Sequence, residues 1–232
     1  MGKRGVATTL GAVLLGEMLR VGLTGGIACG KSLIGGLFAR KGIPVVDDDQ
    51  AARAAVAPGT PGLAAVIQEF GREYLLPDGT LDRPRLGRLV FADDALRRKL
   101  MQITFPHIGR LVQERIGEAE RSGAPILVYE SALLIENGQA DRWRPLIVVW
   151  ASEERQLERL MARNALNRSE AVDRIRSQMP LADKVKLADY AIDNSGSPEE
   201  TERRFEAVFA ALLDRARGAP PQPGSAAADP PR

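Results

Sequence analysis

Residues 25–32 combine types and spacing suited to binding a phosphate chain. They read GGIACGKS and match the pattern G-x-x-x-x-G-K-[ST]. Glycines let a loop curl so that successive backbone N–H groups point at phosphate oxygens, and a following helix adds its positive end. Lys31 can then reach the β- and γ-phosphates, and the Ser32 hydroxyl is a ligand for Mg²⁺. The residues predicted to contact ATP here are Gly25, Gly26, Ile27, Ala28, Cys29, Gly30, Lys31, Ser32 and Leu33.

Three consecutive carboxylates, Asp47, Asp48 and Asp49, close a predicted strand at residues 43–47. Ligands of open α/β sheets bind beyond the carboxyl ends of the strands, so the triplet should face the phosphate loop. A carboxylate there can accept the proton of an attacking hydroxyl. Strand alternation predicts that Asp47 and Asp49 share one side while Asp48 points elsewhere. The alternative is a solvated acidic turn.

Glu130 ends a predicted strand at residues 126–129 in the same manner. This position suits a carboxylate that holds Mg²⁺ through water. The alternative is a carboxylate that caps a helix. Glu136 follows six residues later.

The composition of the chain limits which partners and which kinds of binding site are expected. The net charge of +2 gives no indication of a nucleic-acid partner or a membrane surface. Cys29 is the single cysteine and His107 the single histidine, which excludes a disulfide framework within the chain and any site with several cysteine or histidine ligands. Cys29 lies near a predicted helix N-terminus, which can lower the pKa of a thiol. It is either a passive small residue or a reactive thiol that controls activity.

The pattern of apolar residues predicts a doubly wound α/β sheet with a helical insertion. Five short buried strands are expected at residues 20–24, 43–47, 126–129, 146–150 and 190–193. Helices are expected at 31–41, 153–161, 169–178 and 198–215, with Ser152 and Ser169 as N-caps. Residues 50–121 show helical periodicity and no convincing buried strand.

The two ends differ from the rest. Residues 1–17 contain a short apolar stretch after Lys3 and Arg4 that faintly resembles a signal peptide, but the phosphate loop needs cytoplasmic ATP. Met18 directly precedes the first strand, so we hypothesise that Met18 is the true start and that residues 1–17 are a disordered extension or a misassigned start. The tail is rich in Pro, Ala and Gly and is expected to be disordered. No apolar run is long enough to cross a bilayer, and a cytoplasmic protein is expected.

Beyond the phosphate loop, several segments resemble the dephospho-CoA kinase family from about residue 19 to residue 213. They are LTGGIACGKS (23–32), VVDDDQAAR (45–53), PDGTLDRPRLGRLVF (77–91), ESALLIENG (130–138), ERLMARN (158–164) and QMPLADKVKLADYAIDNSG (178–196). The D-x-D followed four residues later by arginine, the ALLIE segment and the ADYAIDN segment are more specific than the phosphate loop alone.

The resemblance implies a P-loop kinase core with a five-stranded parallel sheet, a helical CoA-binding insertion and a lid. The core would comprise residues 18–50 and 122–214, with the lid at about 155–180, the insertion at 51–121 and the tail at 215–232. It implies Mg²⁺ and ATP as cofactors and dephospho-CoA as the acceptor, without a prediction of oligomeric state.

The resemblance also implies roles for individual residues. Asp49 is the expected base for the ribose 3′-hydroxyl, with Asp47 beside it, and Arg53 lies on the acceptor side. Arg163 is the expected lid arginine that offsets charge on the transferring phosphate. Arg159, one turn earlier, is either a second such residue or part of a solvated face. Asn194 and Ser195 fall where the family approaches the adenine of ATP.

The chain departs from the family at a few positions. The family usually reads His-Pro in the insertion, where this chain has Phe105-Pro106-His107. Either His107 binds the acceptor from a shifted position, or these residues only pack and cap a helix. Ala132 replaces a common proline, and Glu130 a common aspartate.

Two other functions remain open at this point. Another small-molecule P-loop kinase, such as a nucleoside monophosphate kinase, shares the loop but not the insertion of about 70 residues after D-x-D. A non-catalytic ATP-binding module is the alternative from a different class. No N-K-x-D segment of the kind that reads guanine is present.

Overall fold

A computed structural model of the protein describes residues 18–218, so the predictions for residues 1–17 and for most of the tail lie outside it. A parallel five-stranded sheet forms the centre, in the order β2-β3-β1-β4-β5. The strands are β1 (Leu19–Gly25), β2 (Val45–Asp47), β3 (Ile126–Glu130), β4 (Leu146–Trp150) and β5 (Tyr190–Asp193). The predicted strand number and doubly wound class are therefore confirmed.

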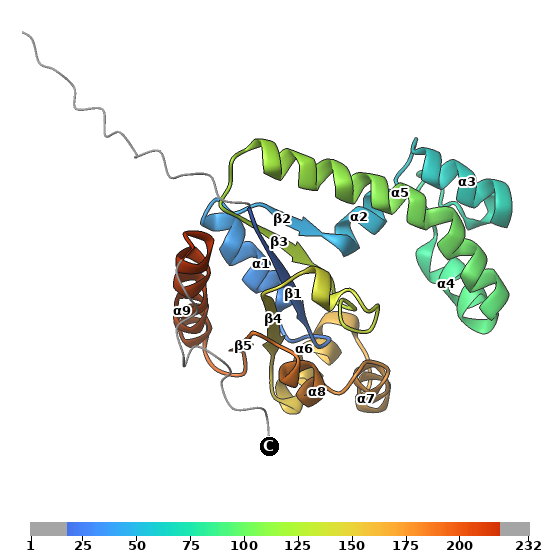
Figure 1. Cartoon of the computed structure of the whole chain (residues 1–232). Helices are drawn as coiled ribbons and strands as arrows, with labels where there is room; N and C mark the ends of the chain where they lie inside the picture. Colours follow the sequence, from blue (N-terminus) through green and yellow to red (C-terminus); the bar gives the residue numbers. More distant parts are fainter. Residues whose placement is uncertain (1–17, 219–232) are drawn as a thin grey trace, which may run out of the picture.

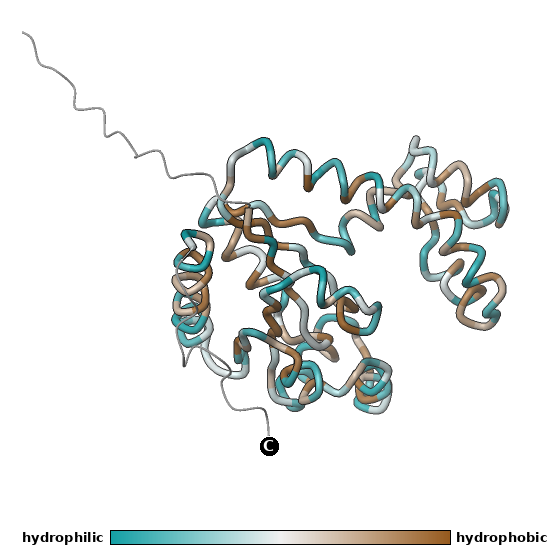
Figure 2. Tube along the Cα trace, viewed as in Figure 1, coloured by the Kyte–Doolittle hydropathy of each residue, from teal (hydrophilic) through white to brown (hydrophobic). Residues whose placement is uncertain are grey.

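Helices cover both faces of the sheet (Figure 1). On one face, α1 (Lys31–Arg40) and α9 (Pro198–Ala216) bury a core that includes Phe38 and Phe205, whose rings meet edge to face at 4.8 Å. On the other face, α5 (Asp94–Arg121) and α8 (Leu181–Lys186) bury a second core. Parallel strands covered on both sides are apolar throughout, and β3 and β4 are fully buried. In Figure 2 these central strands carry mainly hydrophobic residues.

A helical insertion lies between β2 and β3. It contains α2 (Asp48–Ala54), α3 (Pro61–Phe70), α4 (Arg83–Ala92) and the first half of α5, with a small apolar core of its own around Val66 and Leu86. The 28 residues of α5 run from this insertion back to the sheet (Figure 1). One continuous helix therefore connects the insertion to the core. Among residues 18–218, no helix is both long and apolar enough to span a membrane.

The remaining helices, α6 (Glu153–Asn164) and α7 (Arg168–Arg176), form a pair beyond the end of β4. Leu157 and Leu160 of α6 pack on Ala171 of α7. The N-cap of α7 is Asn167, which forms a capping box with Glu170, so the prediction of Ser169 as the cap was wrong. The side chain of Ser152 caps α6 as predicted.

Candidate functional site

The predicted phosphate loop connects β1 to α1 at the carboxyl edge of the sheet. Ala28 and Gly30 both have positive φ angles, 59° and 90°, which curl the backbone in front of the helix. A Cβ atom at Gly30 would overlap the side-chain amide of Asn194, and one at Gly25 would overlap the carbonyl of Val149. The glycines of the motif thus allow the loop to curl and to contact the segments around Val149 and Asn194 closely.

Lys31 and Ser32 converge on Glu130. The Nζ of Lys31 lies 2.7 Å from Oε1 of Glu130, and the Ser32 hydroxyl donates to the same oxygen at 3.2 Å. Glu130 is 3% exposed, and a Cβ atom at Gly35 would overlap its carboxylate. Gly35 therefore leaves room for this side chain beside α1, a role that the motif does not reveal.

Sheet register brings the acidic triplet to the same edge. Strand β3 lies between β1 and β2, and Glu130 is paired with Leu23 on one side and with Asp47 on the other. Glu130 and Asp47 therefore end neighbouring strands, and Lys31, at the start of α1, contacts Glu130. This agrees with the rule that polar groups gather beyond the carboxyl ends of parallel strands.

Strand alternation fails within the triplet, because only Asp47 belongs to the strand. Its carboxylate caps α2 by accepting from the Gln50 backbone N–H at 3.1 Å. Asp48 and Asp49 form the first turn of that helix, where side chains no longer alternate by side. Asp48 accepts from the Ser131 hydroxyl at 3.3 Å, whereas Asp49 is exposed. Of the three carboxylates, Asp49 is thus the one exposed beyond the strand ends.

Asp48 also lies against a buried tyrosine. Burial raises the pKa of Tyr129, and the charge and hydrogen bond of Asp48 raise it further. The Tyr129 ring stacks on Trp143 at 4.3 Å. Tyr129 therefore stays protonated and holds Asp48 in place.

Arg53 and His107 lie at the insertion. Arg53 is exposed in the last turn of α2, and its backbone carbonyl accepts from Nη2 of Arg83 at 3.2 Å. Burial, and then the neighbouring charge of Arg53, lower the pKa of Arg83 below its usual range. The imidazole of His107 lies beside Gly62 at the start of α3. Arg83 was missed because nothing in its immediate sequence pairs it with Arg53.

Phe105 and His107 both lie in the middle of α5, so neither caps a helix. The Phe105 side chain is 57% exposed, and Pro106 lies inside the helix on its exposed side. The alternative that these residues only pack and cap a helix is therefore wrong about capping for both residues. For Phe105 it is also wrong about packing, because that side chain is exposed.

The two arginines of α6 have different surroundings. Arg159 donates to the carbonyls of Ala28 at 3.4 Å and Asn194 at 2.9 Å, whereas Arg163 is exposed and bonds its neighbour Asn164. The structure thus brings Arg159 to the phosphate loop, and it leaves Arg163 at the end of the helix.

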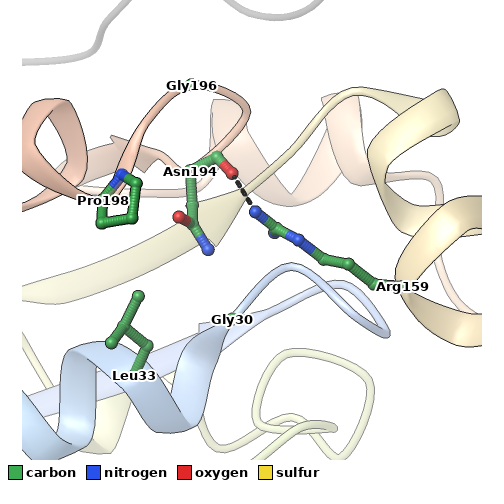
Figure 3. A pocket seen from close by; sticks show the side chains of 6 residues that line it. All are labelled: Gly30, Leu33, Arg159, Asn194, Gly196 and Pro198. Carbon is green, nitrogen blue, oxygen red and sulfur yellow. Dashed lines mark hydrogen bonds between the residues drawn. The ribbon is translucent and has the colours of Figure 1, made fainter. Parts of the chain in front are cut away.

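A pocket of about 250 Å³ opens beside the loop. It is lined by Gly30, Leu33, Arg159, Asn194, Gly196 and Pro198 (Figure 3). Its wall combines a planar guanidinium with apolar surface, a combination suited to an aromatic base. Ser195 turns away from it, since its hydroxyl accepts from the Ser152 backbone N–H at 2.9 Å.

Both polar ends of the Asn194 side chain are hydrogen-bonded within the protein. Its amide donates to the carbonyl of Cys29 at 2.8 Å, and its Oδ1 accepts from the Thr201 hydroxyl at 2.8 Å. Asn194 is 4% exposed. It lines the pocket from a fixed position, and its two polar ends are already bonded.

Cys29 is buried, with no exposed surface. Burial raises the pKa of its thiol to about 11, although backbone N–H groups and the charges of Arg159 and Lys184 act in the opposite direction. Desolvation outweighs the helix terminus here, which favours the passive residue over the reactive thiol.

A buried ion pair lies behind the loop. Lys184 of α8 has no exposed surface, and its Nζ lies 2.6 Å from Oε1 of Glu136. The same Nζ also donates to the carbonyls of Ala132 at 3.4 Å and Gly25 at 3.5 Å. This lysine ties the segment after β3 to the start of the phosphate loop. No pattern in the sequence singled it out.

The surroundings suit ATP with Mg²⁺. The loop offers curled backbone N–H groups, a lysine and a hydroxyl, with Glu130 within reach of both. Among residues 18–218, no group of three or more metal-binding side chains occurs. This arrangement fits Mg²⁺, which commonly binds through one or two protein groups together with substrate phosphates and water.

Comparisons with known proteins identify the family of the chain. The family model for dephospho-CoA kinase matches residues 19–200. A dephospho-CoA kinase from Geobacter sulfurreducens is 47% identical over 190 residues, which cover 82% of this chain and 96% of that protein. One from Arabidopsis thaliana is 44% identical over 190 residues, which cover 82% of each chain.

Solved structures give the same result for the fold. A Thermus thermophilus crystal structure is similar with a TM-score of 0.72 and 34% identity, covering 84% of this chain and 98% of the other. A dephospho-CoA kinase from Campylobacter jejuni has a TM-score of 0.62 and 25% identity, covering 85% and 97%. This chain belongs to the dephospho-CoA kinase family.

Proposed function

We propose that this protein transfers the terminal phosphate of ATP to the ribose 3′-hydroxyl of dephospho-CoA and so forms coenzyme A. One observation carries the proposal beyond family membership. In the strand order β2-β3-β1, Glu130 lies beside Asp47 at the end of β2 and contacts Lys31 at the start of α1, and a helical insertion leads away from the acidic triplet. A donor side and an acceptor side therefore meet at one edge.

On the donor side, backbone N–H groups and Lys31 bind the phosphates of ATP. Ser32 and, through water, Glu130 would hold Mg²⁺, which would offset the charge of the phosphates. Lys31 then exchanges its contact with Glu130 for one with the nucleotide. The base of ATP occupies the pocket beside Arg159 and Leu33.

On the acceptor side, Asp49 accepts the proton of the ribose 3′-hydroxyl and orients its oxygen. Its exposure and its place at the start of α2 support this role. Arg53 and Arg83 are adjacent cations that suit the diphosphate of dephospho-CoA. His107, on α5, also contacts the acceptor.

Three structural units follow from these roles. The core, residues 18–50 and 122–214, binds the nucleotide, and the insertion, residues 51–121, binds the acceptor. A lid at about residues 155–180 contains α6 and α7. In its closed position the lid excludes water, and Arg163 reaches the transferring phosphate.

The experiment that tests the proposal identifies the product. The purified protein is incubated with ATP, Mg²⁺ and dephospho-CoA, and the product is compared with authentic coenzyme A by mass and retention time. We expect one phosphate to be added at the 3′ position. A product phosphorylated elsewhere, or an unchanged acceptor, contradicts the proposal.

A further inference from the structure

The backbone of the phosphate loop is held by side chains from four distant places in the chain. Each bonds one backbone group of the loop. The pairs are Lys184 with the Gly25 carbonyl, Gln178 with the Ile27 N–H, Arg159 with the Ala28 carbonyl and Asn194 with the Cys29 carbonyl. Three of the four bonds go to carbonyls, which cannot bind phosphate. Gln178 differs, because it accepts from an N–H of the kind that the loop presents to phosphates.

The bond of Gln178 is well formed. Its Oε1 accepts from the Ile27 N–H at 2.8 Å across 151 positions of sequence. Gln178 belongs to the short connection between α7 and α8, and its own N–H donates to the carbonyl of Ile175 at 3.3 Å. The side chain therefore reaches the loop from the end of a helix.

The connection that carries Gln178 is itself anchored. The next residue, Met179, donates its backbone N–H to Oε1 of Glu136 at 3.4 Å. The same Glu136 oxygen pairs with the buried Lys184 at 2.6 Å. Gln178 is thus placed by the buried ion pair behind the loop, and its acceptor oxygen is in position before a nucleotide binds.

We propose that Gln178 is a positioning residue for the phosphates of ATP, an inference that rests on the proposed function. By holding the Ile27 N–H, it fixes the curl that turns the N–H groups of the following residues toward the phosphates. Gln178 also stands at the end of the proposed lid, so it links the position of α7 to the shape of the loop. The bond persists when the nucleotide is bound.

The first test replaces Gln178→Met, which keeps the length of the side chain and removes the acceptor. The matched control is Gln102→Met, at an exposed position of α5 in the insertion. We expect ADP to bind about five- to tenfold more weakly to the first variant, the factor that corresponds to one lost hydrogen bond. The KM for ATP should rise by the same factor, and the KM for dephospho-CoA should change less than about twofold.

Two results would overturn the inference. One is ADP binding within about twofold of the unaltered protein. The other is an equal loss of affinity for both substrates together with a lowered melting temperature, which indicates a role in folding alone. The melting temperature of each variant is therefore measured beside its affinities.

A second measurement needs no variant and holds even if Gln178→Met does not fold. Backbone amide exchange of Ile27 is followed by NMR in the unaltered protein, with and without ADP. We expect protection in both states. If ADP removes the protection, Gln178 competes with phosphate for this N–H and the inference is wrong; fast exchange in both states also contradicts it.

These readouts separate the inference from the function on which it rests. ADP affinity and amide exchange do not require transfer to an acceptor. If the proposed function fails, the unaltered protein forms no coenzyme A. If the inference fails, ADP affinity is unchanged in the variant, or both affinities fall equally together with the melting temperature.

Discussion

Lys31 and Glu130 form a nearly buried ion pair in which the ammonium nitrogen lies 2.7 Å from the carboxylate. The lysine of the phosphate loop is thus held by the residue proposed to hold Mg²⁺. The pair keeps Lys31 in place without phosphate.

We expect Lys31→Ala to lower kcat/KM for ATP by about 10²–10³-fold, since a charged donor to the transferring phosphate is lost. Lys41→Ala is the matched control, because this lysine follows the same helix and pairs with Glu206 at the surface. Steady-state kinetics with varied ATP measures both. Near-normal activity of the first variant contradicts the role of the loop.

Asp49→Asn separates the base from the binding site. We expect kcat to fall by about 10²–10⁴-fold, because the amide cannot accept the hydroxyl proton, while ADP affinity stays unchanged. Asp94→Asn, at an exposed position of α5, controls for the loss of one negative charge. A defect confined to nucleotide affinity argues against Asp49 as the base.

Much of this site was predictable from sequence, for a physical reason. The loop motif is local, and parallel strands meet at one edge, so Lys31, Glu130 and Asp47 could be brought together from strand assignments alone. The prediction failed where the chain changed from strand to helix at Asp48, because the alternation rule ends with the strand.

The distant side chains that hold the backbone of the loop could not be predicted in this manner. Arg159, Gln178 and Lys184 are separated from their loop partners by 131, 151 and 159 positions. These contacts depend on how α6, α7 and α8 fold back on the sheet. Cys29 shows the same limit, since its buried position outweighs the helix N-terminus that its sequence suggested.

Cys29 should react slowly with iodoacetamide in the folded protein at pH 8, because its pKa is raised to about 11 and the side chain is buried. Mass spectrometry follows the alkylation, and the protein unfolded in urea serves as the control. Rapid alkylation that ATP prevents would contradict this prediction and support the alternative that Cys29 is a reactive thiol.

The same shift predicts a pH dependence of stability. The pKa of Cys29 is higher in the folded state than its ordinary value of 9.0, so folding favours the protonated thiol. Its contribution is complete below about pH 9 and is lost as the pH rises toward about 11. Cys29→Ala should lose less stability than the unaltered protein over this interval in urea titrations. Equal losses of stability in the two proteins would contradict a raised pKa of Cys29.

Lys184→Met should destabilise the protein by about 3–5 kcal/mol, because Glu136 is left without its buried partner. Replacing Glu136→Leu as well should recover part of this loss. Lys186→Met is the control, since that lysine is 69% exposed and pairs with Asp183 at the surface. Urea denaturation measures all four proteins. If Lys184→Met loses no more stability than Lys186→Met, the buried ion pair does not stabilise the fold as predicted.

The most direct test of the central claim is ADP release from ATP and Mg²⁺ with dephospho-CoA, beside adenosine, AMP, CMP and a blank without acceptor. We predict release that depends on dephospho-CoA. Release only with a nucleoside monophosphate would support the role of the phosphate loop but contradict dephospho-CoA as the acceptor. No release with any acceptor, despite ATP binding, would contradict catalysis itself.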